Sequence, residues 1–172
     1  MAYTANSINK MTMQQKIDFM RQIHSGVLDL WGDDGDFSDA GEDYHKLQDE
    51  LSAHPETLCE QDLLHIMSIF DDSCYELSWQ NALARILARN MIFFGEDRMC
   101  VYLDALDTVP TGGRYHGWKV TVQMLLTQKD AAAVFERAVM SRPAEVKALV
   151  AEILQSIKAD IPGKDDLINK LT

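Results

Sequence analysis

The sequence predicts an all-α fold, an irregular stack of antiparallel helical hairpins that is HEAT-like in outline. Apolar residues recur at intervals of three and four along most of the 172 residues, which is the period of a helix. Strand signals are nearly absent, because the one β-branched stretch, residues 119–122, lies inside a helical pattern. The expected hairpins begin near residues 60, 96 and 130, and a period of about 34–36 residues suits stacked hairpins. A plain helical bundle is the alternative.

The N-terminal part is expected to contain three helices. Helical spacing predicts a long helix over residues 11–30 and a more polar helix over residues 38–53, with Ser38 as its N-cap. Residues 57–60 have the form of a capping box, in which a Thr hydroxyl and a Glu carboxylate accept hydrogen bonds from first-turn N–H groups. This box would open a short helix whose apolar face consists of Leu63, Leu64, Met67 and Phe70.

A helix over residues 78–94 is predicted from an apolar stripe that includes Leu83, Ile86, Leu87, Asn90, Met91 and Phe94. Ser78 is a suitable N-cap, and Gly95 stands where a left-handed residue often ends a helix. Arg85 and Arg89 lie four residues apart on the opposite face, so both are expected to be exposed.

Further helices are predicted over residues 96–108, 115–127, 130–140, 143–159 and 164–171. In the helix over 143–159, Pro143 suits the first turn, Ser141 can act as the cap, and Pro162 and Gly163 follow the end. The chain has the length of one domain, so residues 1–172 are predicted to form a single all-helical domain.

The composition excludes several classes of partner. The chain has 16 Lys and Arg against 27 Asp and Glu, a net charge of −11, which disfavours direct binding to nucleic acid or to anionic lipid. The longest apolar runs fall well short of the roughly 18 residues of a transmembrane helix, and the N-terminus lacks the apolar core of a signal peptide. The three cysteines, in no metal-binding spacing, are expected to be buried or half-buried reduced thiols, which favours a cytoplasmic location.

The negative charge is concentrated in one segment. Residues 29–76 contain fifteen acidic residues and a single basic one, Lys46, whereas the rest of the chain is close to neutral. One interpretation is a solvated acidic surface, and the other is a docking surface for a cationic partner. Aromatic residues interleaved with the carboxylates favour docking, because large rings beside charges are typical of interface anchors.

The residues predicted to bind this partner are the carboxylates that would steer association and the aromatic rings that would anchor it. They are Trp31, Asp33, Asp34, Asp36, Phe37, Asp39, Glu42, Asp43, Tyr44, Asp71, Asp72, Tyr75 and Glu76.

No catalytic residue, metal or cofactor is expected. The five histidines are scattered, and the acidic loop over residues 33–42 lacks the Gly and Glu positions of an EF-hand. Residues 111–118 form the most unusual loop of the sequence, and the preferred interpretation is a flexible linker before a helix. Its glycines could instead let a ligand approach, and an active site around Arg114, His116 and Trp118 is the enzymatic alternative.

A small single domain with an acidic segment over residues 29–76 and no catalytic motif resembles bacterial immunity proteins of contact-dependent inhibition and related toxin systems. Some members of that class are all-helical with HEAT-like packing, and many bind nuclease toxins. The resemblance therefore implies that the acidic surface covers the active-site cleft of a basic toxin domain, because a nuclease holds phosphates in a basic cleft. The alternative is a helical-repeat adaptor or regulator that binds a peptide or protein in a concave face formed by residues 78–127.

Overall fold

The computed structural model describes residues 8–29, 31–32, 36, 38–70, 78–106 and 114–171. Its α-helices are α1 (Met13–His24), α2 (Asp39–Ala53), α3 (Glu60–Met67), α4 (Ser78–Phe94), α5 (Glu96–Asp104), α6 (Arg114–Thr127), α7 (Lys129–Met140), α8 (Ala144–Ser156) and α9 (Asp165–Leu171). Three short 3-10 helices, η1 (Ile8–Lys10), η2 (Pro55–Thr57) and η3 (Lys158–Asp160), complete these elements. No β-strand occurs in this described part of the chain, and the all-α prediction is confirmed.

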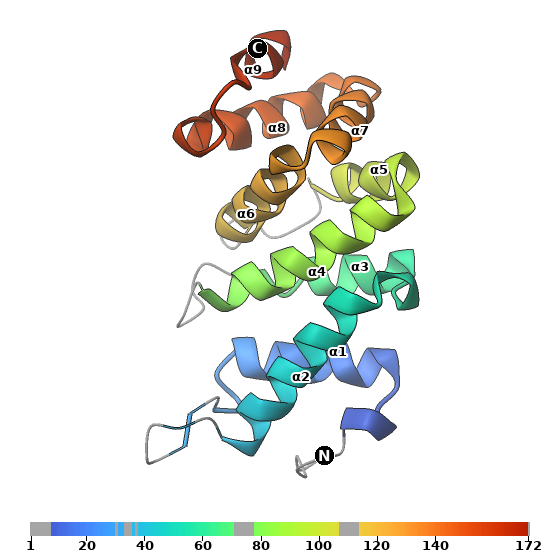
Figure 1. The fold of residues 1–172 in the computed structure, drawn as a ribbon, viewed down its shortest axis with the longest axis vertical. Helices are drawn as coiled ribbons and strands as arrows, with labels where there is room; N and C mark the ends of the chain where they lie inside the picture. Colours follow the sequence, from blue (N-terminus) through green and yellow to red (C-terminus); the bar gives the residue numbers. More distant parts are fainter. Residues whose placement is uncertain are drawn as a thin grey trace.

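The helices form an elongated stack of two layers, with the N-terminus at one end and the C-terminus at the other (Figure 1). In one layer α2 packs on α4, α4 on α6 and α6 on α8. In the other layer α1 packs on α3, α3 on α5 and α5 on α7. Because each helix mainly contacts its neighbours along the stack, the arrangement is that of stacked hairpins, and α9 packs on α8 at the C-terminal end.

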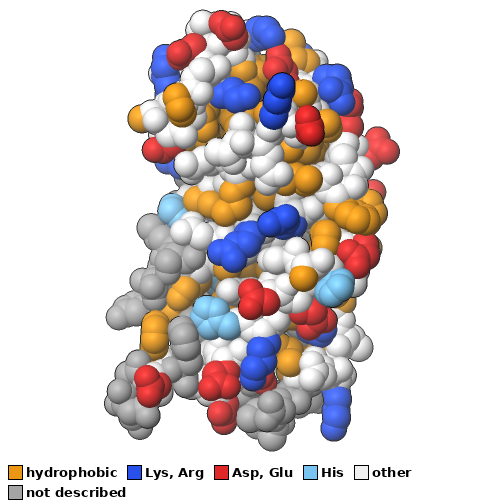
Figure 2. All heavy atoms as spheres, in the orientation of Figure 1, with side chains coloured by type: hydrophobic (Ala, Val, Ile, Leu, Met, Phe, Trp, Pro, Cys, Tyr) orange, Lys and Arg blue, Asp and Glu red, His pale blue; other side chains and the backbone are white. Residues whose placement is uncertain are grey.

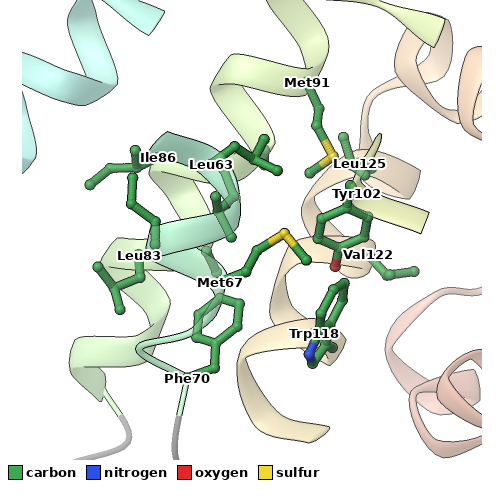
Figure 3. Packing of buried hydrophobic residues seen from close by; sticks show 14 of the residues in the cluster. Leu63, Met67, Phe70, Leu83, Ile86, Met91, Tyr102, Trp118, Val122 and Leu125 are labelled. Atoms are coloured by element: carbon green, nitrogen blue, oxygen red, sulfur yellow. The ribbon is translucent and has the colours of Figure 1, made fainter. Parts of the chain in front are cut away.

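The centre of the stack is held by a cluster of aromatic and aliphatic side chains from α3, α4, α5 and α6 (Figure 3). The ring of Trp118 on α6 lies 4.3 Å from that of Tyr102 and 6.2 Å from that of Phe70, and all three residues are buried. A Cβ atom on Gly117 would lie only 2.3 Å from Cδ1 of Phe70. The missing side chain of Gly117 therefore lets α6 approach the residues that follow α3.

A buried polar network joins η2 to α4 and α5. The guanidinium Nη1 of Arg98 donates hydrogen bonds to Asn90 Oδ1 at 2.8 Å and to the carbonyl of Leu58 at 3.1 Å. The amide Nδ2 of Asn90 donates to the carbonyls of Pro55 at 2.7 Å and of Leu58 at 3.2 Å. Asn90 thus interrupts its apolar stripe to satisfy carbonyls that would otherwise be buried without a partner.

Two helix ends agree with the local sequence signals. Ser38 caps α2, where its hydroxyl accepts a hydrogen bond from the N–H of Gly41 at 3.1 Å. Gly95 follows α4 with a φ of 77°, as expected for a left-handed residue at that position.

Three other expectations about helix ends are wrong. The first helix ends at His24 and is followed by Gly26 at a φ of 72°, so it does not extend to residue 30. The capping box of α3 lies two residues later than predicted, with the N–H of Cys59 donating to the carboxylate of Asp62 at 2.9 Å. Ser141 belongs to the end of α7, because its backbone N–H bonds to Arg137 and its hydroxyl to Ala138, and Pro143 precedes α8.

The thiols also differ in part from expectation. Cys59 is exposed, whereas the sequence predicted a buried or half-buried thiol, and Cys100 is half-buried. Both are free thiols. Cys74 lies outside the described residues.

Candidate protein-binding surface

The described carboxylates of residues 29–76 belong to α2, α3 and the residues around them, so they gather toward the N-terminal end of the stack (Figure 1). Figure 2 shows acidic side chains over this lower part of the molecule and also at the opposite end, with Lys and Arg among them in both places. The acidic character of the N-terminal end follows from the sequence, because residues 29–76 contain fifteen Asp and Glu and a single Lys.

The solvent-facing side of α2 carries four exposed carboxylates, and one of them, Glu50, pairs with Lys16 of α1 at 2.7 Å. Asp39, Glu42 and Asp49 follow one another at intervals of three and seven residues, so they share one face of the helix. Lys46 lies between them, with its Nζ 3.5 Å from the Glu42 carboxylate and 3.4 Å from that of Asp43. Asp43 is the main reason that the pKa of Lys46 is raised, with Glu42 adding to it. Lys16 and Lys46 thus offset only part of the negative charge of this face.

Trp31 and Asp36 lie at the N-terminal end of α2. The N–H of Gly32 donates to the carbonyl of Asp36 at 2.7 Å, which holds these two residues together. The hydroxyl of Ser38 donates to the carbonyl of Asp29 at 2.6 Å, which ties this segment to the cap of α2. Trp31 is 47% exposed, so a large ring is presented to solvent beside acidic side chains. An exposed tryptophan is a frequent anchor in protein interfaces.

Tyr44 and Asp43 are not part of the accessible surface, which corrects their predicted roles. Tyr44 is 1% exposed and belongs to the inward stripe of α2 with Ala40, Leu47 and Leu51. The Asp43 side chain is 2% exposed beside it. Neither side chain can anchor or steer a partner from the interior of the stack.

Tyr44 instead bonds to a buried histidine. Its hydroxyl forms a hydrogen bond with Nε2 of His24, whose ring lies edge-on to Tyr44 at 5.7 Å and to Trp79 at 6.2 Å. Burial lowers the pKa of His24 to about 4, so the ring is neutral at physiological pH. The pair joins α1, α2 and α4 beneath the acidic face.

Seven of the predicted partner-binding residues lie outside the described residues: Asp33, Asp34, Phe37, Asp71, Asp72, Tyr75 and Glu76. The remaining four, Trp31, Asp36, Asp39 and Glu42, are exposed near one another at the start of α2. Asp49 extends this group along the same helix face and was not among the predicted binding residues, although its spacing of seven from Glu42 was a usable signal.

Of the unusual loop predicted over residues 111–118, residues 111–113 and the side chain of Arg114 lie outside what the structure describes. Trp118 is fully buried in the core, so it is not available to a substrate. His116 lies with Nε2 3.2 Å from Oδ1 of Asn81 on α4, and α6 already begins at Arg114. Gly117 allows a close approach of α6 to Phe70.

The residues that the structure describes contain neither a group of metal ligands nor a membrane-spanning helix. Within these ranges no three His, Cys, Asp or Glu side chains are grouped closely enough to hold a metal ion. None of the helices described here combines the length and the apolar character needed to span a bilayer.

Comparisons of the chain with protein-family models, with curated proteins and with solved structures give no significant match. The charges, exposures and contacts given above are therefore the basis for inferring a function.

Proposed function

We propose that this protein binds a basic protein partner through an acidic surface formed by Trp31, Asp36, Asp39, Glu42 and Asp49. The observation that carries the proposal is the concentration of charge: fifteen acidic residues and one lysine within residues 29–76 of a chain that is otherwise near neutral. Like charges close together repel one another and oppose folding. Solubility does not require them to lie in one segment, because charges elsewhere on the surface would serve it equally well. A cationic partner explains the concentration better. The exposed ring of Trp31 supplies an apolar contact beside the carboxylates.

The specific function that we propose is that of a cytoplasmic immunity protein which neutralises a basic toxin domain, a nuclease in the favoured case. Support comes from physical fit: a nuclease cleft is lined with cations that hold phosphates, and a carboxylate surface can occupy that cleft. Such an inhibitor needs no catalytic residue, metal or cofactor of its own. Complementary charge would also accelerate encounter, to about 10⁸–10⁹ per molar per second at low salt.

Co-expression with a toxin tests the immunity proposal. The gene is expected to lie beside one that encodes a basic toxin domain, and the protein should restore growth to cells that express this domain. Asp49→Lys should weaken protection and slow association several-fold, because Asp49 is exposed and has no ion-pair partner in the described part of the chain.

Glu152→Lys on α8 is the matched control, since it makes the same charge change at an exposed position far along the stack. Equal effects of the two substitutions would contradict a localised docking surface. A toxin neutralised equally well by the wild-type protein and Asp49→Lys would leave immunity standing and remove the acidic surface from its explanation.

A further inference from the structure

The exposed side of α4 combines two arginines with a large apolar ring. Arg85, Arg89 and Phe93 follow one another at intervals of four, so they form one stripe on the helix. Both arginines are exposed, and Phe93 is 59% exposed. The opposite side of α4 holds the buried residues Leu83, Leu87 and Met91, so this stripe is not needed to fill the core.

Arg85 and Arg89 differ from the other arginines whose side chains are described. Arg21, Arg137 and Arg142 each form an ion pair, with Asp18, Glu96 and Asp104 respectively, and Arg98 is held in the buried network with Asn90. Arg85 and Arg89 form no hydrogen bond or ion pair with the described residues. Two neighbouring guanidinium groups are thus left with all of their donors for a group outside the chain.

A groove runs beside these arginines, between α4 and α6. Arg85, Arg89 and Ile92 line one wall, and Met124 and Thr127 line the other. Its volume is about 150 Å³, and no carboxylate lines it. This is smaller than the roughly 300–1,000 Å³ of small-molecule sites, so it suits individual side chains rather than a cofactor. Figure 2 shows Lys and Arg side chains across the middle of this face, with hydrophobic side chains beside them.

We propose that this α4 face, defined by Arg85, Arg89, Phe93 and the groove, is a second docking surface that binds an acidic segment of a protein partner. Carboxylates one helical turn apart in that segment would pair with Arg85 and Arg89, since the planar guanidinium matches a carboxylate in a two-point hydrogen-bonded pair. An apolar side chain one turn further would pack on Phe93. Arginine and aromatic residues are the types enriched among the residues that dominate binding energy.

The chemistry of the face favours a peptide over other anions. A nucleic acid requires an extended row of cations, whereas this face offers two arginines beside Ile92, Met124 and Phe93 on a molecule of net charge −11. The face lies on α4 and α6, whereas the acidic surface lies on α2, and the two have opposite charge. It therefore does not depend on the function proposed above.

A designed peptide probes this face in the full-length protein. The probe is a helical peptide with two Glu residues four apart and a Leu four residues further, titrated into ¹⁵N-labelled protein and followed by NMR. We expect shifts confined to α4, α6 and the Nε–H groups of Arg85 and Arg89. The same peptide with Gln in place of Glu should bind at least 10-fold more weakly.

Arg85→Glu combined with Arg89→Glu should abolish detectable binding, and Phe93→Ala should weaken it about 3-fold to 10-fold. Lys10→Glu combined with Lys147→Glu makes the same change in net charge away from α4 and should retain binding. Circular dichroism checks that each variant is folded, which the exposure of both arginines leads us to expect.

Three results would overturn the proposal. One is the absence of shifts at α4 with millimolar peptide. The second is equal binding of an oligothymidylate strand of matched charge, which would indicate a general anion site. The third is self-association of the protein that is lost in the double arginine variant, which would make a second copy of this chain the occupant.

Discussion

The two ends of the stack treat charge differently. From α5 to α9 four carboxylates pair with cations on other elements, among them Glu96 with Arg137 and Asp104 with Arg142. The pairs Glu136–Lys170 and Asp165–Lys158 continue this pattern to the C-terminal end. Around α2, Glu50 pairs with Lys16 of α1 and Lys46 is shared by two carboxylates, while Asp49 has no ion-pair partner in the described part of the chain. The difference between the two regions lies in the supply of cations, because residues 29–76 contain fifteen carboxylates and a single lysine, whereas the rest of the chain is close to neutral.

The largest expected effect concerns the N-terminal end, through His24. Its pKa is about 4 in the folded protein and about 6.5 in the unfolded chain, so between these values the unfolded state binds more protons. The stability provided by neutral His24 is complete above pH 6.5 and is lost as the pH falls toward 4, by about 3 kcal/mol. Urea unfolding of wild type and His24→Gln at several pH values measures this loss as the difference between two curves.

Subtracting the His24→Gln curve from the wild-type curve removes the contribution of carboxylates to the pH dependence of stability, because carboxylates titrate in both proteins. His54→Gln is the control, because His54 is exposed and pairs only with Glu56. Parallel stability curves for wild type and His24→Gln would show that His24 is not held neutral by the packing of α1, α2 and α4.

A somewhat smaller effect is expected at the centre of the stack, where shape rather than charge is decisive. Gly117→Ala should destabilise the protein by about 1–3 kcal/mol, because the added Cβ would lie 2.3 Å from Phe70. Helix propensity alone predicts the opposite sign, a gain of up to about 1 kcal/mol. Equilibrium unfolding in urea distinguishes the two outcomes. The cost of the alanine should fall when Phe70→Leu is also present, and an unchanged cost would assign it to another contact.

The smallest effect compares single carboxylates from the two ends of the stack. Glu96→Gln should destabilise the protein by up to about 1 kcal/mol, because it breaks the pair with Arg137 in the first turn of α5. Asp49→Asn should be neutral or stabilising by a few tenths of a kcal/mol, because it relieves repulsion among the carboxylates of α2. Thermal unfolding at low salt, where both effects are strongest, measures the two values. A loss of stability in both variants would show that the acidic end is balanced after all.

Much of the fold was predictable from local signals. Helical spacing located the helices, and Ser38 and Gly95 marked two of their ends, because capping depends on residues within one turn. The end of α1 at His24 was missed, since apolar spacing continued past it through Val27, which is exposed in the structure. The sequence placed Asn90 on the apolar stripe of α4 but did not show why a polar residue lies there. Its hydrogen bonds reach carbonyls more than thirty residues away in the chain.

The candidate surfaces were predictable only in part. Exposure of Arg85 and Arg89 followed from helix spacing, but their lack of partners depends on which helices lie beside α4. Tyr44 was assigned to the surface because carboxylates surround it in the sequence, although its spacing of three from Leu47 and seven from Leu51 placed it on the inward stripe. In this chain, helical periodicity was a better guide to the position of an aromatic residue than the charge of its neighbours.

The dependence of association rate on salt tests the central claim most directly. Stopped-flow mixing of the wild-type protein with the proposed partner, a basic toxin domain, should give a rate constant that falls at least 10-fold from low to physiological ionic strength. Asp36→Lys combined with Asp49→Lys should remove most of that dependence, because these carboxylates would no longer steer the partner. A rate constant that is indifferent to salt, or unchanged in the double variant, would contradict a docking role for the acidic surface.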